Sequence, residues 1–120
     1  MNVYIISIDK EDLIHGNDID LVGDEAYSVI FKGTPNLIID FERVQRCSSY
    51  MLGKIVGIRK RCFNANGRLI LCGVGPQLME GLKVTGLRIL FEIVEDLDAA
   101  KDAMKESVVS WTPKAEVSGS

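Results

Sequence analysis

The hydrophobic positions of the chain follow two alternating patterns, short continuous runs and helical stripes. Four apolar runs of strand length are separated by polar segments: Val3–Ile8, Leu37–Phe41, Leu69–Cys72 and Ile89–Ile93. Such runs, rich in Val, Ile and Leu, predict strands that are buried as in a parallel sheet. A further short run, Leu13–His15, predicts a small strand that pairs back on the first.

Between these runs, apolar residues recur at steps of three and four, which predicts helices. Four helices are expected: one from Asp18 closed by Gly33, then Tyr50–Asn64, Gln77–Val84, and one capped by Asp96. We expect Asn17 or Asp18 to cap the first helix. Strands that alternate with helices predict an α/β fold with right-handed crossovers. The sheet should be mixed but mostly parallel, with four to five strands and about four helices.

The second predicted helix contains an apolar stripe and a basic triplet. The stripe includes one charged side chain: Leu52, Ile55, Val56, Arg59 and Phe63. The triplet is Arg59–Arg61, and we interpret it as a solvated carboxyl-terminal half that complements the helix dipole. A phosphate or nucleic-acid patch is the less favoured interpretation.

Length and charge narrow the class of protein. The chain has 120 residues and 47% hydrophobic residues, enough for one domain with its own core. Its 14 Lys and Arg against 17 Asp and Glu give a net charge of −3, which argues against a nucleic-acid binder. No apolar run approaches the ~20 residues that span a bilayer, and no secretory signal is visible. We therefore expect a cytoplasmic protein with one domain at 1–109 and a flexible tail at 110–120.

The sequence offers little for catalysis or metal binding. There are three cysteines without C-x-x-C spacing, and His15 is the only histidine. We interpret the cysteines as reduced, mostly buried thiols. The acidic groups near Asp9 and Asp96 are explained by solvation and by the dipole at a helix start. No cofactor or metal is expected, and no enzyme activity.

The segment Cys47–Gly53 lies where a predicted strand and helix meet. Ser48 and Ser49 would sit at a helix amino terminus, where unpaired N–H groups favour an anion. Two interpretations stay open from the residues alone. In the first, one serine is only an N-cap, worth roughly 1 kcal/mol. Alternatively, phosphorylation there would add about −1.5 to −2 charges to a docking surface.

The order of these features resembles the STAS domain, the family of bacterial anti-sigma factor antagonists. The family pattern has a strand that ends in Asp, the motif Asp-Ser-Ser-Gly-Leu-Gly, a helix, a double glycine, a strand with a proline turn, and a Thr/Ser-Gly-Leu turn. The matching segments follow the same order: Asp40, Leu52–Gly53, Asn66–Gly67, Leu69–Pro76, Val84–Leu87 and Phe91–Asp96. The resemblance covers about two-thirds of the chain well.

The register of this resemblance places unusual residues at the family's phosphorylation motif. Ser48 falls on the Asp, Ser49 on the first Ser, Tyr50 on the phosphorylated Ser and Met51 on the Gly. The phosphoacceptor region is therefore Ser48, Ser49 and Tyr50, with Tyr50 in place of the usual acceptor. A phenolic hydroxyl projects much farther than a serine hydroxyl, so we expect Tyr50 to be a poor substrate for the usual kinase.

The resemblance implies a protein-binding module whose partner is an anti-sigma factor, often a serine kinase, in partner-switching control of transcription. The expected contact residues lie at the start of the second helix and in the loop beside it: Ser48, Ser49, Tyr50, Met51, His15 and Asn17. The alternative is a non-phosphorylated scaffold or an accessory subunit of a membrane transport complex. A homodimer stays open, whereas direct binding to nucleic acid or insertion into a membrane is not expected.

Overall fold

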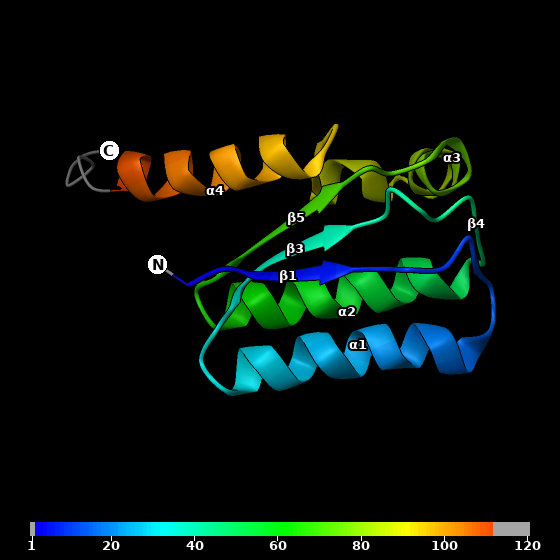
Figure 1. Ribbon diagram of the computed structural model, residues 1–120, viewed down its shortest axis with the longest axis horizontal. Coiled ribbons are helices and arrows are strands. Elements are labelled where there is room, and N and C mark those ends of the chain that lie inside the picture. The colour runs from blue at the N-terminus through cyan, green and yellow to red at the C-terminus, as the bar shows by residue number, and fades with distance from the viewer. Residues whose placement is uncertain (1, 112–120) are drawn as a thin grey trace.

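A four-stranded parallel sheet forms the centre of the molecule (Figure 1). This computed structural model describes the backbone of residues 2–111 and the side chains of residues 2–105. The strands are β1 (Tyr4–Ser7), β3 (Asn36–Asp40), β5 (Arg68–Cys72) and β6 (Glu92–Val94), in the order β1-β3-β5-β6. Every neighbouring pair runs parallel. The predicted α/β fold with a mostly parallel sheet and four helices is confirmed.

Helices cover the two faces of the sheet unequally (Figure 1). Helices α1 (Gly16–Phe31) and α2 (Tyr50–Asn64) pack together on one face, and α4 (Leu97–Trp111) lies alone on the other. Helix α3 (Pro76–Val84) follows β5 and leads into a short 3₁₀ helix, η1 (Leu87–Leu90). The larger core lies between the sheet and α1 and α2. The smaller core lies beneath α4 and has five buried members: Ile38, Ile70, Cys72, Ala100 and Met104.

A second, two-stranded sheet corrects one predicted pairing. Strand β2 (Asp12–Leu13) pairs in parallel with β4 (Arg46–Cys47), not with β1. The N–H groups of Gln45 and Arg46 both donate to the Glu11 carbonyl, at 2.8 and 3.0 Å. The Arg46 guanidinium also holds both carboxylate oxygens of Asp12 at 2.8 Å. This small sheet ties the loop before α1 to the loop before α2.

Three local predictions about the helices and strands need correction. Helix α1 has His15 at its N-cap position without a side-chain cap, so neither Asn17 nor Asp18 plays that role. The strand predicted at Ile89–Ile93 begins only at Glu92, and its first two residues belong to η1. Gly86 turns with a φ of +75°, and the Phe91 N–H closes the turn on the Arg88 carbonyl. The stripe predicted in α2 is buried only in part, and Phe63 is 70% exposed.

The predicted cap of the last helix is confirmed. The carboxylate of Asp96 accepts a hydrogen bond from the Ala99 N–H at 2.8 Å, which caps α4 as expected. Helix α4 is described to Trp111. The rest of the predicted tail, residues 112–120, lies outside the described residues, so the domain boundary stays a prediction.

Candidate functional site

The start of α2 is fixed from three sides. The Ser48 N–H donates to the Leu13 carbonyl at 3.1 Å, which continues the small sheet toward α2. The Cys47 N–H donates to Oε1 of Gln77 on α3 at 2.8 Å. Helix α1 packs along α2. The amino termini of α1 and α2 therefore open on one surface, beside α3.

Tyr50 lies on this surface with its hydroxyl group held by α1. Its side chain is 50% exposed, and its hydroxyl donates to Oδ1 of Asp20 at 2.6 Å. The Lys54 ammonium lies 2.9 Å from the same oxygen and 5.4 Å from the centre of the Tyr50 ring. The stem of Lys54 fits against Gly23, where a Cβ would come within 2.5 Å of the lysine Cδ. Asp20 thus joins α1 to two residues of α2.

These contacts change the protonation of both partners. The hydrogen bonds from Tyr50 and Lys54 lower the pKa of Asp20 below its ordinary value. The hydrogen bond to Asp20 and the negative charge of its carboxylate raise the pKa of Tyr50. The Tyr50 phenol is therefore neutral, and its hydroxyl is engaged as a donor.

The two serines differ in exposure, and neither caps α2. Oγ of Ser48 is buried and has no hydrogen-bond partner among the described atoms. Ser49 is exposed and occupies the N-cap position with φ −63° and ψ −19°. This helical geometry differs from the extended backbone of a typical N-cap residue, and its side chain makes no capping bond. The capping interpretation is therefore wrong for both serines.

Met51 does not reach the surface, which corrects its prediction as a contact residue. Its side chain has no exposed area. It begins the buried face of α2, which points at the sheet: Met51, Leu52, Ile55, Ile58 and Cys62. Tyr50 and Met51 are separated by about 100° around the helix. Tyr50 therefore faces solvent, whereas Met51 faces the core.

The first residues of α1, where the sequence predicted a loop, lie next to Tyr50. His15 and Asn17 are both exposed, and a Cβ added to Gly16 would lie 3.8 Å from the Tyr50 ring. The structure therefore brings four of the predicted contact residues to one side of the molecule: His15, Asn17, Ser49 and Tyr50. Ser48 lies at this junction with its hydroxyl group facing inward.

Three residues of this surface were missed from the sequence: Asp20, Lys54 and Gln77. The spacing of Tyr50 and Lys54, one helical turn apart, could have indicated that they lie together. Asp20 and Gln77 reach the junction only through tertiary packing, which no local pattern reveals. Gly53 was noted for its match to the family pattern. It is exposed on the first turns of α2, and a Cβ built on it would meet nothing within 4 Å.

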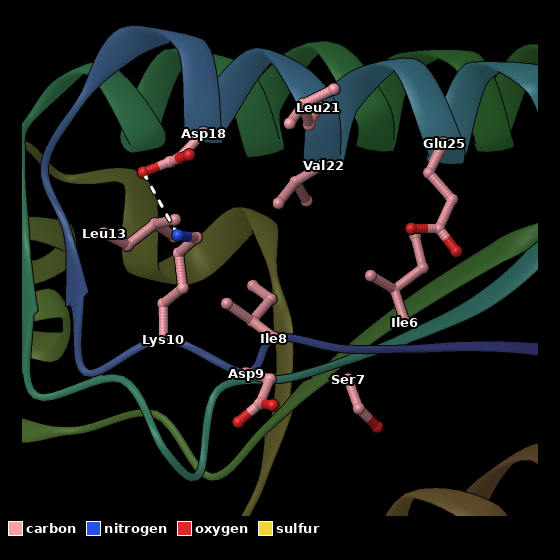
Figure 2. Close-up of a pocket in the computed structure, with 10 residues that line it drawn as sticks. All are labelled: Ile6, Ser7, Ile8, Asp9, Lys10, Leu13, Asp18, Leu21, Val22 and Glu25. Carbon is pink, nitrogen blue, oxygen red and sulfur yellow. Dashed lines mark ion pairs between the residues drawn. The ribbon is translucent and has the colours of Figure 1, made fainter.

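A surface pocket of about 220 Å³ lies between the end of β1, the following loop and α1 (Figure 2). Apolar side chains line much of it: Ile6, Ile8, Leu13, Leu21 and Val22. Each carboxylate at the pocket has a local partner: Asp9 with Arg43 (3.0 Å), Asp18 with Lys10 (3.6 Å), and Glu25 with the Tyr4 hydroxyl (2.6 Å). Each of these three carboxylates is therefore already paired with a neighbouring side chain, and none of them is left unpaired at the pocket.

The Cys47 thiol is not activated as a nucleophile. Burial raises the pKa of Cys47 to about 11, so this half-buried thiol stays protonated near neutral pH.

Among residues 2–105, no group of three or more His, Cys, Asp or Glu side chains is placed to hold a metal ion. No helix within the described part of the chain is long and apolar enough to cross a membrane.

Comparisons with known proteins agree with this architecture. The STAS domain family model matches residues 2–100. BtrV of Bordetella bronchiseptica, provisionally named an anti-sigma factor antagonist, is 25% identical over 84 residues, which cover 70% of this chain and 72% of BtrV.

Two solved structures share the fold. An anti-sigma-factor antagonist (STAS) domain protein from Planctomyces limnophilus is 23% identical, with a TM-score of 0.75 over 84% of this chain and 89% of that one. The Bacillus cell-fate determinant SpoIIAA in its phosphorylated form is 21% identical, with a TM-score of 0.65 over 82% and 88% of the two chains. The family match and the shared fold lead to one conclusion: this chain belongs to the STAS domain family.

Proposed function

We propose that this chain is an anti-sigma factor antagonist that binds an anti-sigma factor of the kinase type in the cytoplasm and so takes part in partner-switching control of transcription. The contact surface is formed by the starts of α2 and α1, with Ser49, Tyr50, His15 and Asn17 exposed on it. The proposal rests on the exposure of Ser49 and Tyr50, the residues that the resemblance in sequence aligns with the family's phosphorylation motif.

The same surface supports Ser49 as the phosphoacceptor. The Ser48 hydroxyl is buried, and the Tyr50 hydroxyl is engaged by a carboxylate that would repel a phosphate. Ser49 is exposed and makes no capping bond. A phosphate on Ser49 would lie at the amino terminus of α2, whose first turn has no acidic residue. The helix dipole stabilises an anion in that place.

Gly53 supports close approach of a partner to α2. Nothing within the described structure requires a glycine at this exposed helical position. A helical glycine costs about 1 kcal/mol relative to alanine, so its presence calls for another reason. A partner that packs directly on the backbone of α2 supplies one.

One observation favours the scaffold as a second candidate function. Tyr50 stands at the family's usual acceptor position, and its contacts with Asp20 and Lys54 hold its side chain in place. No phosphate is needed to order this residue. A module of this kind would bind its partner constitutively. The two functions differ in how binding responds to a negative charge at Ser49.

The test uses purified histidine-kinase-like anti-sigma factors encoded in the same genome as the chain. Binding is measured by isothermal titration calorimetry, and phosphorylation by mass spectrometry after incubation with each kinase and ATP. We expect one kinase to bind, to phosphorylate Ser49 and to leave Tyr50 unmodified. Ser49→Asp should weaken binding more than tenfold, because it adds a charge at the contact surface.

Matched variants separate the outcomes. Ser28→Asp places the same charge on an exposed position of α1, away from the start of α2, and should leave affinity unchanged. Binding that survives Ser49→Asp but is lost in Tyr50→Ala would favour the constitutive scaffold. The proposal is wrong if no kinase of the set binds, or if neither Ser49→Asp nor Tyr50→Ala changes the affinity.

A further inference from the structure

A second exposed apolar surface lies at the other end of α2. Phe63 is 70% exposed, Ile89 is 89% exposed and Leu90 is 38% exposed. Phe63 and Leu90 line one surface pocket of about 180 Å³, and Ile89 neighbours Leu90 in η1. A cavity of about 150 Å³ is known to hold a benzene molecule. This pocket, which we call the Phe63 pocket, therefore has room for one large apolar side chain.

The walls of the Phe63 pocket are fixed by hydrogen bonds. Nε of Arg59 donates to the Leu90 carbonyl at 2.7 Å, and its guanidinium lies 6.0 Å from the centre of the Phe63 ring. Arg68 forms an ion pair with Glu92, the one acidic residue in the lining. Arg68 also donates to the Ala103 carbonyl of α4 at 2.8 Å. The pocket is thus formed before any partner binds, which reduces the ordering cost of binding.

Cations lie in the Phe63 pocket and next to it in the chain. Arg59 lines it, Lys60 precedes Phe63 by three positions on α2, and Arg88 lies on η1 with its guanidinium donating to the Phe91 carbonyl at 3.2 Å. None of these three has a carboxylate within ion-pairing distance among the described side chains. The only carboxylate of the pocket is already neutralised by Arg68. In a chain with a net charge of −3, this end of α2 therefore carries local positive charge.

We propose that the Phe63 pocket docks an acidic amphipathic segment of another protein. One large apolar side chain of that segment would fill the pocket, and its carboxylates would pair with the free cations. Charge complementarity of this kind sets specificity and association rate. The surface goes beyond the proposed contact at the start of α2 and does not depend on it.

Three other occupants fit the surface less well. A second copy of the chain docked through the same surface would bring like charges together, which is unfavourable. Residues 112–120 contain one Lys and one Glu, so they offer no net negative charge. A lipid surface suits a broad and continuous apolar face, whereas the lining of this pocket includes the charged residues Arg59, Arg68 and Glu92.

The two surfaces lie at opposite ends of one helix. Helix α2 has 15 residues and a rise of about 1.5 Å per residue, so its ends are roughly 20 Å apart. The residues of the two surfaces do not overlap, so the Phe63 pocket is separate from the proposed contact at the start of α2.

The test selects phage-displayed random 15-residue peptides on the immobilised full chain. We expect the selected peptides to be rich in Asp and Glu around one aromatic or large aliphatic residue. Affinity of a labelled selected peptide is then measured by fluorescence anisotropy. Phe63→Ser should weaken it at least tenfold, and Lys60→Glu should weaken it and reduce its dependence on salt.

Matched controls place the effect on this surface. Phe31→Ser removes another exposed phenylalanine, at the end of α1, and Lys101→Glu reverses an exposed charge on α4. Both variants should bind like the unmodified chain, and so should Tyr50→Ala. All five changes affect exposed side chains, and circular dichroism checks that each variant is folded.

Several outcomes would overturn the proposal. Selected peptides without acidic residues would do so, as would peptides whose affinity is the same for Phe63→Ser and the unmodified chain. Co-sedimentation with vesicles of phosphatidylcholine and phosphatidylglycerol that Phe63→Ser abolishes would assign the surface to lipid instead. A dimer in analytical ultracentrifugation that Phe63→Ser dissociates would assign it to a second copy. Tighter peptide binding after removal of residues 112–120 would assign it to that segment.

Discussion

At the scale of single residues, the Tyr50 phenol shows how the fold sets the chemistry of the α2 surface. Its contact with Asp20 raises the pKa of Tyr50 above the ordinary value of 10.0. The folded state therefore favours the protonated phenol. This contribution to stability is complete below pH 10 and is lost as the pH rises through the raised pKa.

Asp20→Asn removes the negative charge and leaves Lys54 beside the phenol, so the pKa of Tyr50 should fall. Carbon-13 NMR titration of the tyrosine Cζ atoms measures this shift. The hydroxyl of Tyr4 is hydrogen-bonded to Glu25, which raises its pKa independently of Asp20. Tyr4 is therefore an internal control that should not change. An unchanged Tyr50 pKa in Asp20→Asn would show that this hydrogen bond does not persist in solution.

Met51 belongs to the core in spite of its place in the motif. Its side chain is fully buried, and an aspartate there would be an unpaired charge in an apolar environment. We expect Met51→Asp to lose cooperative unfolding in urea, measured by circular dichroism. Phe31→Asp introduces the same charge at a position that is 92% exposed, and it should unfold like the unmodified chain. A cooperative transition in Met51→Asp would mean that this side chain is accessible.

At the scale of elements, two glycines near the ends of α2 should respond to alanine in opposite directions. Gly53 lies in open space within the helix, so Gly53→Ala should raise the free energy of unfolding by about 0.5–1 kcal/mol. At Gly67, a Cβ would overlap the backbone carbonyl of Pro35, and the strand β5 begins at the next residue. Gly67→Ala should therefore cost about 1–3 kcal/mol. Urea denaturation measures both, and two changes of the same sign would contradict the packing described.

Elements with local signals could be predicted from the sequence, and those defined by distant contacts could not. The bounds of α2 and the cap at Asp96 follow from periodicity and a side chain that reaches its own helix. The pairing of β2 with β4 depends on Glu11 and Asp12 meeting residues more than 30 positions away, and no local pattern encodes this contact.

In the candidate site, too, some residues could be predicted from the sequence and others could not. The family resemblance identified Ser49 and Tyr50, whereas the orientation of Met51 was missed because neighbouring residues on a helix face different directions. The left-handed residue after α2 is Asn66, with a φ of +62°, and not the glycine that follows it. Gly67 is required instead by its contact with Pro35. Such a contact is visible only once the chain is folded.

At the scale of the whole molecule, the two faces of the sheet are stabilised unequally. Helices α1 and α2 share the larger core with the sheet, whereas α4 buries only Ala100 and Met104 among its described side chains. The Arg68 contact with the Ala103 carbonyl adds one polar tie to α4. Helices with few buried apolar contacts open locally before the rest of a domain unfolds. We therefore expect α4 to be the first helix to detach from the sheet.

Substitution of two buried methionines tests whether the two faces of the sheet differ in stability. Met104 lies under α4 with 2% of its side chain exposed, and Met51 lies in the larger core with none exposed. Methionine-to-alanine changes in cores cost about 2–5 kcal/mol. Met104→Ala should speed amide hydrogen exchange in α4 and leave exchange in α1 and α2 nearly unchanged, because only the local opening becomes easier. Met51→Ala should speed amide hydrogen exchange in the sheet and in all the helices, because it makes global unfolding easier. If the two variants speed exchange in α1 equally, the molecule unfolds as a single unit.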